Sequence, residues 1–311
     1  MEQLLRRFLL YLSTAGWARS LVSRLWVARR VARRFVAGET LQDAINATVT
    51  LNQAGLLASL DYLGESVSSE ADTQAVVQTY QNLLTSIHDR QLKASVSLKL
   101  THLGLDISED LCIRNLRQLL TQAQQNGNIP VTIDMESSHY TETTLRIYRT
   151  LRDEYSFANV GTVIQAYLYR SLKDMQELTR ENARIRICKG AYLEPADVAF
   201  PVKADVDKQY AQIVDEYLTA PTDSYLDIAT HDEAMIQSAQ QTVKQHQVPS
   251  DRYEFQMLYG IRSSRQTELA SAGYKVRVYV PFGEAWYPYF MRRLAERPAN
   301  LWFFARSFFR G

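Results

Sequence analysis

The chain has 311 residues, of which 46% are hydrophobic and 22% charged, and its formal net charge is +1. This composition is typical of a globular protein with one large core, and the near-neutral charge argues against a dedicated nucleic-acid-binding protein. The only cysteines are Cys112 and Cys188, too few for a disulfide scaffold, which favours a reducing cytoplasm. No apolar run approaches the roughly 20 residues that cross a bilayer as a helix.

Residues 1–57 have a helical pattern with an excess of positive charge near the start. The stretch LRRFLLYLSTAGWA (5–18) resembles an export signal, but Ser13 and Thr14 interrupt its apolar run, so we do not expect export. Residues 1–36 contain one acid, Glu2, and eight arginines: Arg6, Arg7, Arg19, Arg24, Arg29, Arg30, Arg33 and Arg34. On a helix, the last four of these lie opposite an apolar side. Such a basic amphipathic helix can rest on an anionic membrane surface, or it can pack on the main domain with its arginines in water.

After residue 57, short β-rich runs alternate with helical runs. The expected strands are 58–62, 94–100, 130–135, 159–167, 184–188, 225–229, 253–257 and 275–280, and expected helices include 71–90, 108–126, 141–153, 203–218, 232–246 and 263–272. This alternation favours a (β/α)8 TIM-type barrel of residues 58–311, with residues 1–57 as a helical arm packed on it. An open doubly wound sheet is the alternative, although the chain has neither G-x-G-x-x-G nor G-x-x-x-x-G-K-[ST].

Apolar and polar side chains alternate within the strands. Because helices cover the outside of a barrel, the apolar set should face the helices and the polar set the barrel axis. The polar set is Ser95, Ser97, Lys99, Thr132, Asp134, Gln165, Arg184, Arg186, Asp227, Arg277 and Tyr279. Buried polar groups are costly unless paired, and barrel active sites lie at the carboxyl ends of the strands, so we interpret the set as a ligand site. Arg184 and Arg277 could instead lie at solvated strand ends.

The stretch YPYFMRRLAERP (287–298) places Tyr289, Arg292, Arg293 and Glu296 on one face of a helix. Guanidinium groups match carboxylates with two parallel hydrogen bonds, so this face can clamp a carboxylate ligand, with Glu296 orienting one arginine. The alternative is an amphipathic surface helix with a solvated charged face.

Eight separated motifs lie near the ends of the expected strands. They are SLDYLGE (59–65), SLKLTHLGL (97–105), IDME (133–136), IQAYLYR (164–170), RICKGAYLEP (186–195), ATHD (229–232), YEFQMLYG (253–260) and VYVPFGEAWYPYFMRRLAE (278–296). In this order they resemble the FAD-dependent proline dehydrogenases, specifically the short bacterial monofunctional form, over residues 58–305. The resemblance implies oxidation of L-proline to Δ1-pyrroline-5-carboxylate, the first step of proline catabolism, by hydride transfer from proline C5 to flavin N5, with electrons passed to a membrane quinone.

The resemblance also implies that FAD lies across the C-terminal mouth of the barrel and that the last helix, which bears the arginines, covers the substrate. Individual side chains around the substrate would then have the following roles. Arg292 and Arg293 would clamp the proline carboxylate, with Glu296 orienting them and Lys99 as a third positive group. Asp134 would hold Lys99 in place, or it could belong to a purely structural ion pair. The proline ring would be surrounded by Tyr192, Leu258, Tyr279 and Tyr289. Glu65 would pair with Arg292 and close the site, and Tyr279 would favour L-proline over trans-4-hydroxy-L-proline, because hydroxyproline-tolerant relatives carry serine there.

For the cofactor, the resemblance implies that Gln165 and Arg186 contact the isoalloxazine ring of FAD, with Arg186 near N5. The expected contacts of the ribityl chain, pyrophosphate or adenosine are Lys189, Gly190, Ala191, Thr230 and His231. Electron transfer to a membrane quinone would bring the enzyme to the inner face of the cell membrane, where the basic N-terminal residues could contact the lipid surface. The product could then pass to a pyrroline-5-carboxylate dehydrogenase.

Other functions fit parts of the pattern. A flavin barrel of the methylenetetrahydrofolate reductase kind has related architecture, but nothing in the sequence calls for a folate. A Schiff-base lyase could use Lys99 or Lys189, since both fall at strand ends. A metal barrel could use Asp134, Glu136 and His139, although the last two lie beyond the strand, and we expect no metal. A non-enzymatic binding protein is a further alternative, for which a buried polar mouth is an unusual surface.

Overall fold

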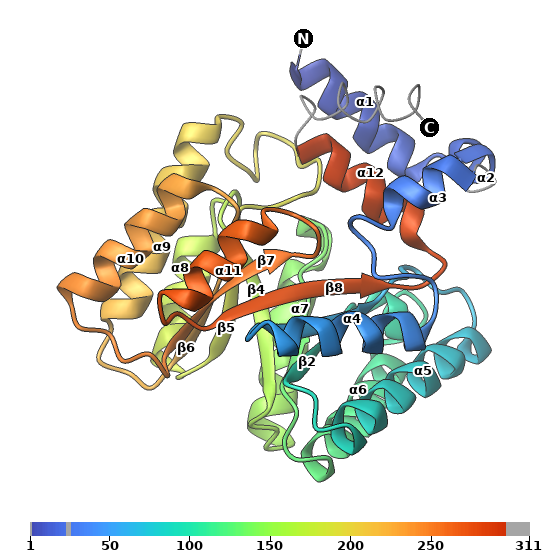
Figure 1. The fold of residues 1–311 in the computed structure, drawn as a ribbon, viewed down its shortest axis with the longest axis horizontal. Helices are drawn as coiled ribbons and strands as arrows, with labels where there is room; N and C mark the ends of the chain where they lie inside the picture. Colours follow the sequence, from blue (N-terminus) through green and yellow to red (C-terminus); the bar gives the residue numbers. More distant parts are fainter. Residues whose placement is uncertain (1, 23–25, 297–311) are drawn as a thin grey trace.

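The computed structural model describes residues 2–22 and 26–296, and its centre is a closed barrel of eight parallel strands in sequence order (Figure 1). The strands are β1 (Leu57–Tyr62), β2 (Ala94–Leu98), β3 (Val131–Ile133), β4 (Val160–Gln165), β5 (Arg184–Cys188), β6 (Tyr225–Ala229), β7 (Tyr253–Leu258) and β8 (Val276–Phe282). The barrel closes where Leu57 of β1 pairs with Arg277 of β8. The expected (β/α)8 barrel is confirmed, and each expected strand overlaps an observed one.

Helices connect the strands on the outside of the barrel. They are α5 (Glu70–Asp89), α6 (Glu109–Gln125), α7 (Ser138–Arg149), α8 (Ser171–Arg180), α9 (Lys203–Thr219), α10 (Glu233–Gln245) and α11 (Ser263–Ser271). The sequence itself starts some of them: the side chain of Ser69 accepts a hydrogen bond from the Asp72 N–H at the first turn of α5. Helix α8 is not among the expected helices, although Met175 and Leu178, three residues apart, are its buried positions.

The wall position between β8 and β1 is filled by a helix that precedes the barrel. Helix α4 (Leu41–Gln53) packs against both strands, and Ala44 and Ile45 join the barrel core. It begins at a capping box formed by Thr40 and Asp43. In the usual barrel each strand is followed by its own wall helix, but the helix after β8 lies elsewhere. The division of the chain at residue 57 stays a proposal, since α4 belongs to the wall.

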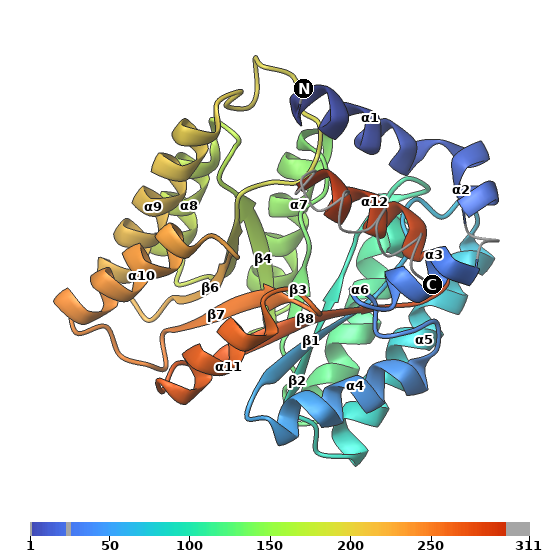
Figure 2. The same ribbon diagram turned by 45° about the horizontal axis from the view of Figure 1, so that its top comes forward.

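The two ends of the chain meet in a second hydrophobic cluster. Helices α1 (Glu2–Thr14), α2 (Gly16–Val22) and α3 (Trp26–Ala32) pack against α12 (Trp286–Glu296), and Figure 2 shows α1 beside α12. We call the buried set the terminal cluster: Leu9, Leu10, Ala18, Ala28, Ala32, Val36, Leu63, Trp286, Tyr287, Tyr289, Phe290, Met291, Leu294 and Ala295. The barrel core is a separate cluster of residues between Ala44 and Phe282.

The helical arm consists of the helices α1, α2 and α3, and the stretch expected as a basic amphipathic helix contains α3. The first break coincides with Gly16, and glycine weakens a helix more than any residue except proline. Arg30, Arg33 and Arg34 are exposed, as expected of a solvated basic side. The side chains of the arginines at 6, 7, 19, 24 and 29 and of the leucines at 21 and 25 lie outside the described part of the chain. Within that part, no helix is long and apolar enough to span a membrane.

Candidate active site

The polar side chains of the strands meet on the barrel axis, as the alternation predicts. They form a chain of opposite charges made of Asp61, Lys99, Asp134, Arg186, Asp227, Glu254 and Arg277, each at most 9% exposed. Buried charges are tolerated only when they are paired; six of these side chains pair with one another, and Asp227 pairs with Arg184. Arg277 is buried against Glu254, at 3.0 Å from Nη2 to Oε2, so it does not lie at a solvated strand end. Arg184 is partly exposed and donates to Asp227 at 2.8 Å.

Lys99 lies just beyond β2, between two carboxylates. Its Nζ is 2.9 Å from Oδ2 of Asp61 and 3.7 Å from Oδ2 of Asp134. Burial would lower the pKa of the Lys99 ammonium, but the two carboxylates outweigh burial and raise the pKa above its usual value. Lys99 is therefore a fixed positive charge at neutral pH, which disfavours the neutral, nucleophilic lysine of a Schiff-base lyase.

Arg186 of β5 is held from three sides. Its Nε donates to Oε1 of Gln256 at 2.6 Å, Nη1 to Oδ1 of Asp134 at 2.6 Å, and Nη2 to Oγ of Ser97 at 3.0 Å. Its guanidinium carbon also lies 5.4 Å from the centre of the Tyr279 ring. These contacts from four different strands give the guanidinium a single orientation.

Tyr279 of β8 joins the same network. Its hydroxyl donates to Oδ2 of Asp134 at 2.6 Å, so Asp134 contacts Lys99, Arg186 and Tyr279 together. Burial, with the negative charges of Asp134 and Asp61, raises the pKa of the Tyr279 phenol well above its usual value. The phenol is therefore neutral, and its ring is fixed by the hydrogen bond.

Helix α12 brings the arginine pair to the barrel mouth. Arg292 donates to both oxygens of Glu65, from Nη2 at 2.5 Å and from Nη1 at 3.3 Å, so the expected pair is present. Its guanidinium carbon is 5.7 Å from the centre of the Tyr192 ring. Arg293 is half-buried and lies 5.1 Å from the ring centre of Tyr289, which is buried in the terminal cluster. The side chain of the last residue of α12, Glu296, lies outside the described residues, so its orienting role stays a prediction.

Tyr192 and Leu258, expected beside the proline ring, are both half-buried. The loop that carries Tyr192 is anchored two residues later, where Oε1 of Glu194 accepts from the N–H of Ser138 at 2.7 Å. Leu258 ends β7, and its N–H donates to Nε2 of His231 at 2.9 Å. These contacts hold the loop of Tyr192 and the backbone of Leu258 in place.

A buried acid, Glu136, lies behind the mouth. Its Oε1 accepts from the N–H of Thr101 at 3.1 Å and its Oε2 from the Thr101 hydroxyl at 2.7 Å. Burial raises the pKa of the Glu136 carboxyl to about 7, against the effect of these hydrogen bonds. His139, the other residue considered for a metal, is exposed. The described residues contain no group of three or more His, Cys, Asp or Glu that could hold a metal ion.

Two of the residues expected at the cofactor, Gln165 and Gly190, have distinctive surroundings. Gln165 is 3% exposed, and its Oε1 has no hydrogen-bond partner among the described residues. A buried oxygen in this state can accept a hydrogen bond from a bound ligand. Gly190 has φ +109°, and a Cβ atom there would overlap the ring of Tyr167, so the chain after β5 needs glycine at this turn.

The remaining expected cofactor contacts lie on the loops after β5 and β6. Lys189 donates to Asp207 and, at 2.7 Å, to Oδ2 of Asp232. The hydroxyl of Thr230 accepts from the Asp232 N–H at 3.0 Å. Ala191 and His231 are half-buried. The structure places these residues at the carboxyl ends of β5 and β6, where a barrel binds its ligands.

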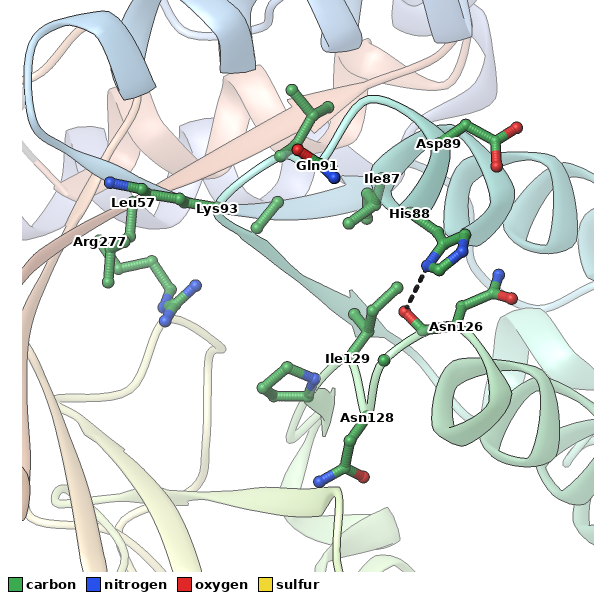
Figure 3. A pocket seen from close by; sticks show the side chains of 14 residues that line it. Leu57, Ile87, His88, Asp89, Gln91, Lys93, Asn126, Asn128, Ile129 and Arg277 are labelled. Carbon is green, nitrogen blue, oxygen red and sulfur yellow. Dashed lines mark hydrogen bonds between the residues drawn. The ribbon is translucent and has the colours of Figure 1, made fainter.

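A cavity of about 650 Å³ lies at the opposite end of the barrel (Figure 3). It is lined by the starts of β1 and β2, with Leu57 and Ala94, and by the loops around His88 and Asn128. Arg277 also lines it and already bonds Glu254. Because barrel enzymes react at the carboxyl ends of their strands, we do not assign the active site to this cavity.

Several residues of the network were not among the predicted site residues. They are Asp61, Ser97, Glu254 and Gln256. All four are on the axis side of their strands, and Ser97 was already part of the polar set. The same alternation, applied to SLDY (59–62) and YEFQ (253–256), would have found the other three.

A (β/α)8 barrel with buried charged side chains at the carboxyl ends of its strands and an arginine-bearing helix beside them has the architecture of a barrel enzyme. The family model described as "Proline dehydrogenase" matches residues 44–306. The chain belongs to the proline dehydrogenase family. It is an oxidoreductase that catalyses the first step of proline catabolism.

The relatives cover nearly the whole chain. "Proline dehydrogenase 1" of Bacillus subtilis is 45% identical over 278 residues, which are 89% of this chain and 90% of the relative. "Proline dehydrogenase" of Deinococcus radiodurans is 40% identical over 315 residues, or 100% of both chains. Among solved structures, proline utilization A from Bdellovibrio bacteriovorus, inactivated by N-propargylglycine, has a TM-score of 0.82 at 24% identity. That likeness covers 91% of this chain but only 34% of the larger protein, and it shows the fold alone.

Proposed function

We propose that the protein uses FAD to oxidise L-proline to Δ1-pyrroline-5-carboxylate. The observation that carries the flavin is the buried Oε1 of Gln165, which has no partner among the described residues and lies on the strand next to that of Arg186. When bound, the flavin would accept the hydride that leaves C5 of proline. Gln165 and Arg186 would hold the ring, and Lys189, Gly190, Ala191, Thr230 and His231 the rest of the cofactor.

Three positive groups at the mouth would bind the carboxylate of proline. Arg292 and Arg293 come from α12, and Lys99 from the end of β2. A hydrogen bond to a charged group contributes about 1.5–3 kcal/mol, so several such contacts can supply most of the binding energy of so small a substrate. Asp61 and Asp134 keep Lys99 in place, and Glu65 does the same for Arg292.

The same side chains would control the state of the amine. Only the neutral amine of proline can release a hydride from C5, because its lone pair forms the new C=N bond. A site closed to water disfavours the ammonium form, and three nearby cations disfavour it further. The positive guanidinium of Arg186 would stabilise the negative charge that accumulates on the cofactor side during the reaction.

The visible spectrum of the purified protein tests this proposal. We expect the bands of an oxidised flavin, and we expect them to bleach when L-proline is added without oxygen. A colourless protein with full proline-oxidising activity would overturn the assignment of FAD. Borohydride trapping of substrate on Lys99 or Lys189 would instead favour a Schiff-base enzyme.

The electrons would pass to a membrane quinone, and the helical arm offers a surface for the membrane. Four large apolar side chains of α1 and α2 are exposed: Leu5 (37%), Phe8 (55%), Tyr11 (59%) and Trp17 (62%). Aromatic residues beside arginines are typical of segments that lie at a lipid interface. The enzyme would therefore be cytoplasmic and peripheral at the inner face of the cell membrane, where a pyrroline-5-carboxylate dehydrogenase could take up its product.

Liposome flotation tests the membrane contact. We expect the full chain to float with anionic vesicles, and a chain without residues 1–40 to float less. The double variant Phe8→Ser, Trp17→Ser should behave like the shortened chain. Val202→Ser is the matched control, because Val202 is also exposed (53%) but lies on the loop before α9. Equal flotation of all four proteins would exclude this surface.

A further inference from the structure

Gln256 of β7 connects Arg186 to a second ion pair deeper in the barrel. Its Oε1 accepts from Nε of Arg186 at 2.6 Å, and its Nε2 donates to Oε1 of Glu254 at 2.6 Å. Glu254 in turn accepts from Nη2 of Arg277 at 3.0 Å. Gln256 is 3% exposed and Glu254 is fully buried. The amide is therefore the only neutral group between two buried ion pairs along this chain of contacts.

The orientation of the Gln256 amide is determined by its two neighbours. A guanidinium can only donate hydrogen bonds, and an ionised carboxylate can only accept them. Burial alone would raise the pKa of Glu254, but the charges of Arg277 and Arg184 outweigh it and lower the pKa to about 2. Glu254 is therefore ionised at neutral pH. If the Gln256 amide were flipped, its NH2 group would face the Arg186 donor and its oxygen would face the Glu254 carboxylate. Only the observed orientation therefore satisfies both neighbours.

We propose that Gln256 is a positioning residue that keeps Arg186 at the mouth of the barrel and thereby sets the reduction potential of the flavin. This inference rests on the proposed function, because it requires a flavin beside Arg186. Arg186 has five N–H groups, and Gln256, Asp134 and Ser97 use three of them. Two N–H groups remain for a ligand.

The physical reason lies in the carboxylates at the base of the barrel. Asp227 and Glu254 are buried there, and the negative charge of Asp227 already acts on Arg186. An apolar residue at position 256 would remove the neutral acceptor that separates Arg186 from Glu254. Asp134 and Ser97 would still hold the two terminal nitrogens, but Nε would lose its partner, and the guanidinium would turn toward these carboxylates and away from the mouth. A positive charge farther from the flavin stabilises the reduced, more negative form less.

The test compares flavin reduction potentials of purified holoenzymes by equilibration with a reference dye. For Gln256→Leu we expect an equilibrium constant for two-electron reduction about tenfold lower than in the wild type, which corresponds to about 30 mV. Gln256→Asn keeps the amide but is one methylene shorter and cannot reach both partners, so we expect a smaller shift in the same direction. Asn159→Leu is the matched control: Asn159 is also a buried amide, donates to the Ile129 carbonyl at the base of the barrel, and should leave the potential unchanged.

The outcomes separate this inference from the proposed function. If the wild type binds no flavin, the proposed function fails. If the bound flavin has the same reduction potential in the wild type and in the Gln256 variants, the positioning role of Gln256 is wrong. If Gln256→Leu does not fold, the potential of Gln256→Asn decides. A shift of equal size in Asn159→Leu would also overturn the inference, because it would show that any lost buried amide has this effect.

Discussion

Arg292 and Arg293 are neighbours in the sequence but have different surroundings. Arg292 is tied to Glu65 and faces the Tyr192 ring, whereas Arg293 lies along Tyr289 of its own helix. Arg292 therefore joins α12 to the loop after β1, whereas Arg293 rests on a ring that is buried in the terminal cluster.

Replacing either arginine should weaken proline binding. We expect Arg292→Met or Arg293→Met to raise the Michaelis constant for proline roughly 10- to 100-fold, the equivalent of one charge-assisted hydrogen bond. Lysine at either position should also fail, because it lacks the paired donors of a guanidinium. The flavin spectrum should be unchanged and serves as the control. Wild-type kinetics for proline in both variants would contradict the clamp.

Tyr279 should determine the choice between proline and its hydroxylated form. The bond to Asp134 fixes the phenol, which would leave no space for a hydroxyl on C4 of the substrate. An unpaired buried hydroxyl costs about 1–3 kcal/mol. We therefore expect a strong preference for L-proline over trans-4-hydroxy-L-proline. Tyr279→Ser should reduce this preference, mostly because activity with proline is lost. The space left by the phenol does not by itself supply good contacts for hydroxyproline. The ratio of kcat/KM for the two substrates is the measurement, and an unchanged ratio would show that Tyr279 does not contact the ring.

Glu136 should make stability depend on pH. Burial raises its pKa from 4.5 to about 7 in the folded protein, so the folded state holds an extra proton between these values. The contribution is fully present below pH 4.5 and is lost as the pH rises through 7. Relative to Glu136→Gln, which cannot titrate, the free energy of unfolding of the wild type should therefore fall by up to about 3 kcal/mol across this range. Parallel stability curves from chemical denaturation would contradict this pKa.

At the scale of elements, the strands were predictable because a barrel imposes two rules on them. One side must be apolar to meet the helices, and polar groups on the other side must be paired. Arg186, Asp134 and Tyr279 follow from this alternation. Which axis-facing residues pair with one another does not follow from it, since contacts such as that of Arg186 with Gln256 join residues 70 positions apart. The place of α12 at the mouth was expected from the family resemblance alone, because an amphipathic pattern shows that a helix packs on something but not on what.

Glu65 and Arg292 connect two elements, the loop after β1 and helix α12. The Glu65 side chain is 30% exposed and the Arg292 side chain 11%, so solvent reaches the pair mainly from the side of Glu65. We expect Glu65→Ala to lower kcat/KM for proline roughly tenfold by leaving α12 less firmly closed over the substrate. Glu284→Ala is the control, since Glu284 is an exposed acid just before the same helix. If Glu65→Ala leaves both proline affinity and turnover unchanged, the pair is not a gate.

For the whole molecule, the separation of the barrel core from the terminal cluster has a consequence for how the protein can be shortened. Helix α4, which precedes β1 in the sequence, completes the helical wall of the barrel. Residues 39–282 therefore contain every buried residue of the barrel core. The segments before residue 39 and after residue 282 could therefore be removed without removing a helix from the wall of the barrel. We expect the fragment 39–282 to keep the circular dichroism of the barrel and its flavin colour, but to lose bleaching by proline. Flavin binding and substrate binding would then depend on two separable parts of the chain. A fragment that does not fold and does not bind flavin would show that the barrel needs the terminal cluster for its stability.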